Sequence, residues 1–133
     1  MMARLLSYRD LEVWKRSMDL VIDVYELTRA LPPSERYGLA SQMRRAATSV
    51  AANIAEGNGR IHRKDYAHHV SIARGSISEL ITCLEIARRL GYLSAALVTP
   101  VLQQADIISR MLLMLLRALE RPARSPRVTA PAR

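Results

Sequence analysis

Hydrophobic residues recur every three to four positions along most of the chain, in four segments separated by short breaks. The breaks are Pro32-Pro33, Gly57-Asn58-Gly59 and Gly91, and a proline-rich tail begins at Pro122. Spacings of three and four place residues on one face of an α-helix, whereas half-buried strands alternate with a period of two. No segment shows that alternation. The pattern therefore predicts four helices and no strand.

The first predicted helix, residues 10–30, carries two apolar lines. One line has the heptad-like spacing of a helix that faces a core, and we take it as the core seam: Leu11, Trp14, Met18, Val21 and Tyr25. The other line lies on a second flank: Val13, Leu20, Val24, Leu27 and Leu31. Pro32-Pro33 should end this helix because proline lacks the amide hydrogen that a helix interior needs.

The second predicted helix, residues 35–56, is rich in alanine and therefore thin, which lets neighbouring helices approach closely. Its core stripe is Leu39, Met43, Ala46, Val50 and Ile54. Ser34 is the expected N-cap and Gly57 the expected C-terminal cap.

The third predicted helix covers residues 64–90, and Gly91 should cap its end. Its stripe is Tyr66, Val70, Ala73, Ile77, Leu80, Leu84 and Ala87. Gly75 inside it costs about 1 kcal/mol relative to alanine, and we attribute the glycine to close packing against the thin second helix.

The fourth predicted helix covers residues 94–120. Its main stripe is Val98, Val101, Ala105, Ile108, Leu112, Leu115 and Leu119, and a second one is Ile107, Met111, Met114 and Ala118. Pro100 leaves two possible beginnings. Either Thr99 caps a helix whose first residue is Pro100, or a turn from Ser94 is kinked at the proline.

Four helices with short connections predict an all-α, up-down-up-down antiparallel bundle. A three-helix array with a detached fourth helix is the alternative. The expected organisation is an N-terminal arm at 1–9, the bundle at 10–120 and a basic, disordered Pro/Arg-rich tail at 121–133.

The first and last helices carry more apolar surface than a four-helix core can hide. Large exposed apolar patches usually mark interfaces, so we expect a homo-oligomer. The expected interface residues are Val13, Leu20, Val24, Leu27, Met111 and Met114. The alternative is a monomer with a thick core and some exposed leucines, which is normal at low density.

Composition narrows the class of protein. A chain of 133 residues, 50% hydrophobic, is one domain and not wholly disordered. No apolar run approaches the ~18 residues of a membrane span, and the N-terminus lacks the apolar stretch of a secretory signal. The single cysteine, Cys83, fits a reducing compartment. We expect a cytoplasmic protein without membrane contact.

A polar stripe runs along the second predicted helix and continues on the third: Gln42, Arg45, Ser49, Asn53 and Glu56, with Ser76 and Glu79. If the chain turns near Arg60, residue x lies opposite 120 − x, and an Arg45–Glu79 ion pair is reasonable. The stripe is either an internal polar contact between helices that fixes their register or a surface for a ligand or nucleic acid.

The net charge is +8, and 18 of the 20 basic residues are arginine. In an up-down bundle, residues 1–12, 56–66 and 117–133 share one end. That end holds ten basic and five acidic residues, which is +5 of the +8.

The candidate phosphate contacts there are Arg60, Arg63, Lys64, Arg121 and Arg124, with Arg44 and Arg74 as further candidates on the flank. Aromatic residues are dispersed, so binding should depend on salt and be indifferent to sequence. The alternative is a solvated tail that contributes little.

Signals for catalysis or metal binding are weak. His62, Asp65, His68 and His69 cluster, but a metal site needs three or four convergent ligands, so we expect a solvated helix face. Gly57-Asn58-Gly59-Arg60 follows a helix and lacks a phosphate-loop ending. Cys83 should be a buried, inert thiol. We expect no enzyme activity, metal or cofactor.

Several motifs together resemble the bacterial four helix bundle protein family, over about residues 8 to 120. They are Tyr8-Arg9-Asp10-Leu11-Glu12-Val13-Trp14, the stretch 35–47, Ser49-Val50-Ala51-Ala52-Asn53-Ile54-Ala55-Glu56-Gly57, Ile72-Ala73-Arg74-Gly75-Ser76 with Glu79, and Leu90-Gly91-Tyr92-Leu93. Some relatives are encoded by intervening sequences in large-subunit ribosomal RNA genes, and the family is similar to the accessory protein of diversity-generating retroelements. The resemblance implies a four-helix protomer, a ring of five, and a basic surface that touches RNA, DNA or a reverse transcriptase. It implies no enzyme activity.

Three functions therefore compete. The first is a non-catalytic, self-assembling bundle that presents a basic surface to RNA or DNA. The second is a structural or protein-adaptor oligomer whose charge serves solubility. The third is a small-ligand binder, which requires an open pocket that reaches Arg45, Ser49 and Asn53.

Overall fold

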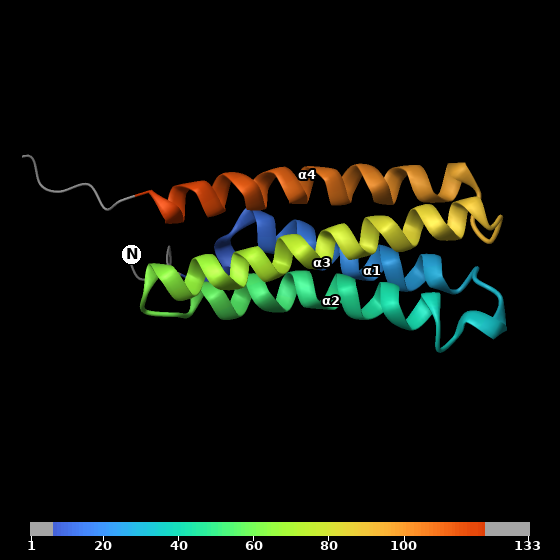
Figure 1. The fold of residues 1–133 in the computed structure, drawn as a ribbon, viewed down its shortest axis with the longest axis horizontal. Coiled ribbons are helices and arrows are strands. Elements are labelled where there is room, and N and C mark those ends of the chain that lie inside the picture. Colours follow the sequence, from blue (N-terminus) through green and yellow to red (C-terminus); the bar gives the residue numbers. More distant parts are fainter. Residues whose placement is uncertain (1–6, 122–133) are drawn as a thin grey trace, which may run out of the picture.

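The structure is a computed structural model that describes residues 7–121. These residues form helices and no strand (Figure 1). The elements are the short 3-10 helix η2 (Tyr8–Asp10), α1 (Glu12–Thr28), the 3-10 helix η3 (Pro33–Glu35), α2 (Leu39–Asn58), α3 (Arg63–Arg89) and α4 (Ala95–Glu120). Of the predicted arm and tail, only residues 7–9 and Arg121 belong to the described part.

The four long helices lie side by side and alternate in direction (Figure 1). The α2–α3 turn and the end of α4 are at one end, whereas the α1–α2 and α3–α4 connections are at the other. Consecutive helices pack on each other, and α1 also packs on α4. The predicted antiparallel four-helix bundle is confirmed, and the alternative with a detached fourth helix is wrong.

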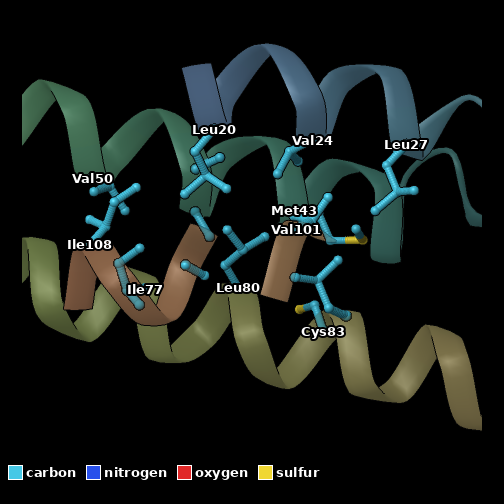
Figure 2. Packing of buried hydrophobic residues seen from close by; sticks show 14 of the residues in the cluster. Leu20, Val24, Leu27, Met43, Val50, Ile77, Leu80, Cys83, Val101 and Ile108 are labelled. Carbon is cyan, nitrogen blue, oxygen red and sulfur yellow. The ribbon is translucent and has the colours of Figure 1, made fainter. Parts of the chain in front are cut away.

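One core runs along the bundle axis and receives side chains from all four helices (Figure 2). Leu20 from α1, Met43 from α2, Leu80 from α3 and Ile108 from α4 all belong to this core, and each is at most 1% exposed. Each such side chain contributes about 1.5–3 kcal/mol when it leaves water. The predicted stripes of the second, third and fourth helices supply most of this core.

The two apolar lines of α1 are exchanged relative to the prediction. Val13, Leu20, Val24 and Leu27 point into the core and are buried, so they are not available for contact with another protomer. The line predicted as the seam is half-buried or exposed instead, as Trp14 and Met18 show. Ser17 hides the true seam in the sequence, because its polar side chain interrupts the buried line. Its hydroxyl donates a 2.7 Å hydrogen bond to the Val13 carbonyl, so burial leaves no unmet polar group.

The beginning of α2 differs from the prediction. Pro33 to Glu35 form a separate 3-10 turn, and α2 begins at Leu39 after Gly38. Ser34 is therefore not the N-cap. Instead, a Glu35 carboxylate oxygen accepts a 3.0 Å hydrogen bond from the Leu39 amide, which would otherwise lack a partner at the helix start.

Gly57 lies inside α2 and is not its C-cap, because the helix continues to Asn58. It is buried at the contact between α2 and α3. A Cβ atom at this position would lie 2.7 Å from His69 Cβ and 3.3 Å from the Tyr66 carbonyl oxygen. Glycine is thus required here by the close contact between the helices.

The end of α3 is formed as predicted by Gly91, the described glycine with a positive φ, at 79°. The Tyr92 and Gly91 amides donate to the carbonyls of Ala87 and Arg88, which is the Schellman arrangement. Gly75 does not fit its prediction. A Cβ atom there would meet nothing within 4 Å, so close packing does not explain this glycine.

The structure shows where α4 begins relative to Pro100. The Ser94 hydroxyl accepts a 3.2 Å hydrogen bond from the Leu97 amide and caps a helix that begins at Ala95. Pro100 lies inside this helix, so Thr99 is not the cap. Further along α4, Gln104 donates a 2.8 Å hydrogen bond to Asp23 and ties α4 to α1.

Candidate functional site

Two residues of the polar stripe of α2, Ser49 and Asn53, face α3 and form the centre of a hydrogen-bonded seam between the two helices. The Ser76 hydroxyl donates to the Ser49 hydroxyl at 2.8 Å. The Asn53 amide nitrogen donates to the Ser49 carbonyl and hydroxyl oxygens at 2.9 and 3.1 Å. These polar groups satisfy one another at a helix contact, which fixes how α2 and α3 align.

His69 belongs to this seam, although the sequence placed it on a solvated face. It is half-buried, and its Nδ1 lies 2.9 Å from the Asn53 amide oxygen. Because the Asn53 nitrogen donates to Ser49, the oxygen must accept from His69, so Nδ1 carries the proton. A sequence signal existed: His69, Ser76 and Cys83 are spaced by seven and lie on one flank of α3.

The seam continues toward both ends of the helices. At one end, the Cys83 thiol donates to the Gln42 side-chain oxygen at 3.4 Å. Burial raises the pKa of this thiol, and the negative charge of Glu79 raises it further. At the other end, the Asn58 amide donates to the Tyr66 hydroxyl at 3.2 Å.

The helix register differs from the prediction. Ser49 lies opposite Ser76 and Gln42 opposite Cys83, not opposite residues 71 and 78. The reason is that α2 continues past Gly57, so the chain reverses later. Arg45 and Glu79 are both exposed, and residues 7–121 contain no ion pair between them. Glu56 is also outside the seam and pairs with Arg60 at 2.9 Å.

The seam argues against the small-ligand hypothesis. That hypothesis needs an open pocket that reaches Arg45, Ser49 and Asn53, but the serine is hydrogen-bonded to Ser76 and the asparagine to His69 across the contact between the helices. Within the part of the chain that the structure describes, no group of three or more His, Cys, Asp or Glu side chains is placed to hold a metal ion. None of the described helices is both long and apolar enough to cross a membrane.

The candidate phosphate contacts near the α2–α3 turn are partly engaged within the protein. Arg63 donates to the Ala118 and Leu119 carbonyls at 2.6 and 3.3 Å and thereby caps the end of α4. Arg60 is paired with Glu56, while Lys64 and Arg121 are exposed. Arg124 lies outside the described residues.

Charge is distributed differently from what the whole-chain count suggests. The described part of the predicted basic end, 7–12, 56–66 and 117–121, holds six basic and five acidic residues. The opposite end, 26–45 and 85–97, holds six arginines and three glutamates. Among described residues, the excess of positive charge therefore lies at the end with the α1–α2 and α3–α4 connections.

The two flank candidates occupy defined positions. Arg44 donates through Nε to the Thr28 hydroxyl at 2.9 Å, and its guanidinium lies 4.7 Å from the centre of the Tyr25 ring. Arg74 is half-buried, and its Nε has no hydrogen-bond partner among residues 7–121.

An apolar surface remains exposed on α1. Ile22 is 61% exposed and shares this face with Met18 and Tyr25, which are also exposed. On α4, Met114 is 70% exposed while Met111 is half-buried. A nearby hollow of about 270 Å³ between α1 and α2 is lined by Tyr8, Trp14, Met18, Val21, Thr48 and three alanines of α2.

These features define an antiparallel four-helix bundle held in register by a polar seam. The family model of the 23S rRNA-intervening sequence protein matches residues 9–114, and the chain belongs to this family. The resemblance seen in the sequence motifs is thereby confirmed.

Among solved structures, the chain is similar to a protein of unknown function from the S23 ribosomal protein family of Bacteroides thetaiotaomicron. The sequences are 22% identical and the TM-score is 0.74. The match covers 79% of this chain and 98% of that chain. At this identity the likeness shows the fold alone. Comparison with curated proteins gave no significant match.

Proposed function

We propose that this protein is a non-catalytic helical scaffold that assembles with copies of itself and presents arginines to RNA or DNA. The observation that carries the proposal is the surplus of cations. Five of the fourteen described arginines form ion pairs with carboxylates, and nine do not. Clustered arginines attract the phosphate backbone through counterion release, which needs no base-specific contact.

Self-assembly is supported by the exposed face of α1, which we call the α1 apolar face: Met18, Ile22 and Tyr25. These side chains follow the i, i+4, i+7 spacing of one helix face. The hollow between α1 and α2 lies beside it and is mostly apolar. A copy of the chain that covers this surface would remove apolar area from water and bring several sets of arginines together. A ring of five is the assembly that the family resemblance implies.

A protein adaptor is the second candidate function, and the hollow between α1 and α2 favours it. Trp14 and Tyr8 line this hollow with their rings 5.2 Å apart, edge to face. Aromatic side chains beside small alanines offer the kind of surface into which a partner helix packs. A reverse transcriptase, which the family resemblance implies, would be a partner of this kind.

Binding of the full chain to single-stranded RNA in a salt series tests the proposal. We expect measurable binding at about 50 mM salt. The affinity should fall steeply toward about 200 mM, because the release of counterions from the nucleic acid is less favourable at higher salt. Absence of binding at the lower salt contradicts nucleic-acid recognition. A partner protein that is captured equally well after nuclease treatment, with no RNA binding, supports the adaptor instead.

A further inference from the structure

A small hollow at the α1–α2 connection is lined by two arginines and no carboxylate. Its volume is about 280 Å³, and its walls include Thr28, Pro33, Arg36, Ala40 and Arg44. Ligand pockets are usually about 300–1,000 Å³, so this hollow is close to the lower end of that range and has room for a charged group such as a phosphate. We call it the arginine hollow.

Arg44 is held in place from two sides. Its Nε donates to the Thr28 hydroxyl, and that hydroxyl donates in turn to the Tyr25 carbonyl at 2.8 Å. The Tyr25 ring supports the guanidinium from its face. The terminal nitrogens form no ion pair within residues 7–121. An arginine fixed in this way loses little side-chain entropy when it binds an anion.

The carboxylates around the arginine hollow are engaged elsewhere. Both oxygens of Glu35 accept hydrogen bonds, one from the Leu39 amide and the other from the Tyr92 hydroxyl at 3.3 Å. Glu26 pairs with Arg29 at 3.5 Å. Arg36 forms no ion pair in the described part of the chain. Neither guanidinium of the arginine hollow is therefore ion-paired within residues 7–121, so both can pair with an anion.

Tyr37 adds an aromatic surface next to this charge. Its side chain is 87% exposed, and the Arg36 guanidinium lies 5.8 Å from its ring centre. Proteins that bind single-stranded nucleic acid combine such arginines with aromatic rings on which bases stack. A large aromatic side chain that contributes nothing to the core fits this role.

We infer that the arginine hollow binds a backbone phosphate of single-stranded nucleic acid while Tyr37 stacks on an adjacent base. This inference rests on the proposed nucleic-acid function and locates its contact. It places the site at the end of the bundle opposite Arg60, Arg63 and Lys64, which are the candidate phosphate contacts predicted from the sequence.

The test compares three double variants of the full chain by fluorescence anisotropy with labelled oligouridylate. Arg36→Gln/Arg44→Gln removes the hollow's charge, Arg88→Gln/Arg89→Gln removes the same charge from the same end, and Arg60→Gln/Lys64→Gln removes it from the opposite end. For the first variant we expect at least about tenfold weaker binding and a salt slope reduced by about one, because one phosphate contact is lost. We expect changes below about threefold for the other two.

A further variant, Tyr37→Ala, leaves the contacts that hold Arg44 in place unchanged. Tyr37→Ala should weaken oligouridylate binding about fivefold or more, because each stacked base contributes appreciably. On an abasic oligonucleotide of equal length the Tyr37→Ala effect should vanish, while the arginine effect should persist.

The outcomes separate the inference from the proposed function. If Arg36→Gln/Arg44→Gln and Tyr37→Ala both bind as wild type while Arg60→Gln/Lys64→Gln loses binding, the inference is wrong and the function stands. If the wild-type chain binds no RNA at about 50 mM salt, both fail.

Discussion

Two glycines inside helices show how strongly one position can depend on its surroundings. Gly57 faces His69 and Tyr66 at the α2–α3 contact, while Gly75 faces open space. Alanine is the better helix former at both positions by about 1 kcal/mol. At Gly57 that gain is opposed by a clash with atoms that cannot move without displacing a helix.

Matched substitutions at these glycines should therefore have opposite signs. We expect Gly75→Ala to raise the free energy of unfolding by about 0.5–1 kcal/mol. Gly57→Ala should lower it by about 1 kcal/mol or more, as overpacking does. Urea denaturation measures both changes. Equal stabilisation by the two variants would contradict the close approach of α2 and α3 at Gly57.

Cys83 provides a chemical test of the seam. Burial and the charge of Glu79 raise the pKa of its thiol above the ordinary value, so less of the reactive thiolate is present at any given pH. We expect native protein at pH 8 to react with a thiol reagent much more slowly than protein unfolded in urea. The native rate should continue to rise with pH beyond the ordinary thiol pKa. Equal rates in the two states would contradict the burial of Cys83 between the helices.

At the scale of elements, a double-mutant cycle can isolate one contact of the α2–α3 seam, the hydrogen bond between Ser49 and Ser76. Ser49→Ala leaves the Ser76 hydroxyl without its acceptor and removes one of the two acceptors of the Asn53 amide nitrogen, and should cost about 1–2 kcal/mol. Ser76→Ala should cost about 1 kcal/mol. The double variant should cost less than both together, by at least about 0.5 kcal/mol. Strict additivity would show that the serines do not interact.

Helix positions were predictable from spacing because glycine, proline and apolar periodicity act locally. The boundaries that were wrong depend on side chains that no local rule selects. Glu35 caps α2 from outside the helix, and the contact with α3 explains Gly57. The choice between the two apolar lines of α1 failed for a similar reason, since Ser17 satisfies its own hydroxyl within the helix and is buried at no cost in lost hydrogen bonds.

The candidate site was only partly predictable. The seam residues Ser49, Asn53 and Ser76 were found from their spacing, but His69 was assigned to a solvated face. Of the arginine hollow, Arg44 was a candidate phosphate contact from the sequence, but Arg36 and Tyr37 were not. The hollow forms where the α1–α2 connection packs beside the start of α2, and nothing in the spacing of Arg36 and Tyr37 distinguishes them from ordinary surface residues.

At the scale of the whole molecule, the α1 apolar face should control assembly. Ile22→Glu places a charge where a neighbouring copy would cover it, and burying an unpaired carboxylate is costly. We expect this variant to dissociate toward the protomer mass while it keeps its helix content by circular dichroism. Ile61→Glu is the matched control, because Ile61 is 93% exposed outside this face. Equal masses for both variants would contradict an interface on the α1 apolar face.

The mass of the full chain in solution tests the central proposal most directly. Multi-angle light scattering at micromolar concentration, after nuclease treatment in high salt, removes any contribution from nucleic acid. The proposed scaffold predicts the mass of an assembly of two or more protomers, each of 14.9 kDa. A soluble species of 14.9 kDa at that concentration would contradict self-assembly and, with it, the gathering of several arginine surfaces in one particle.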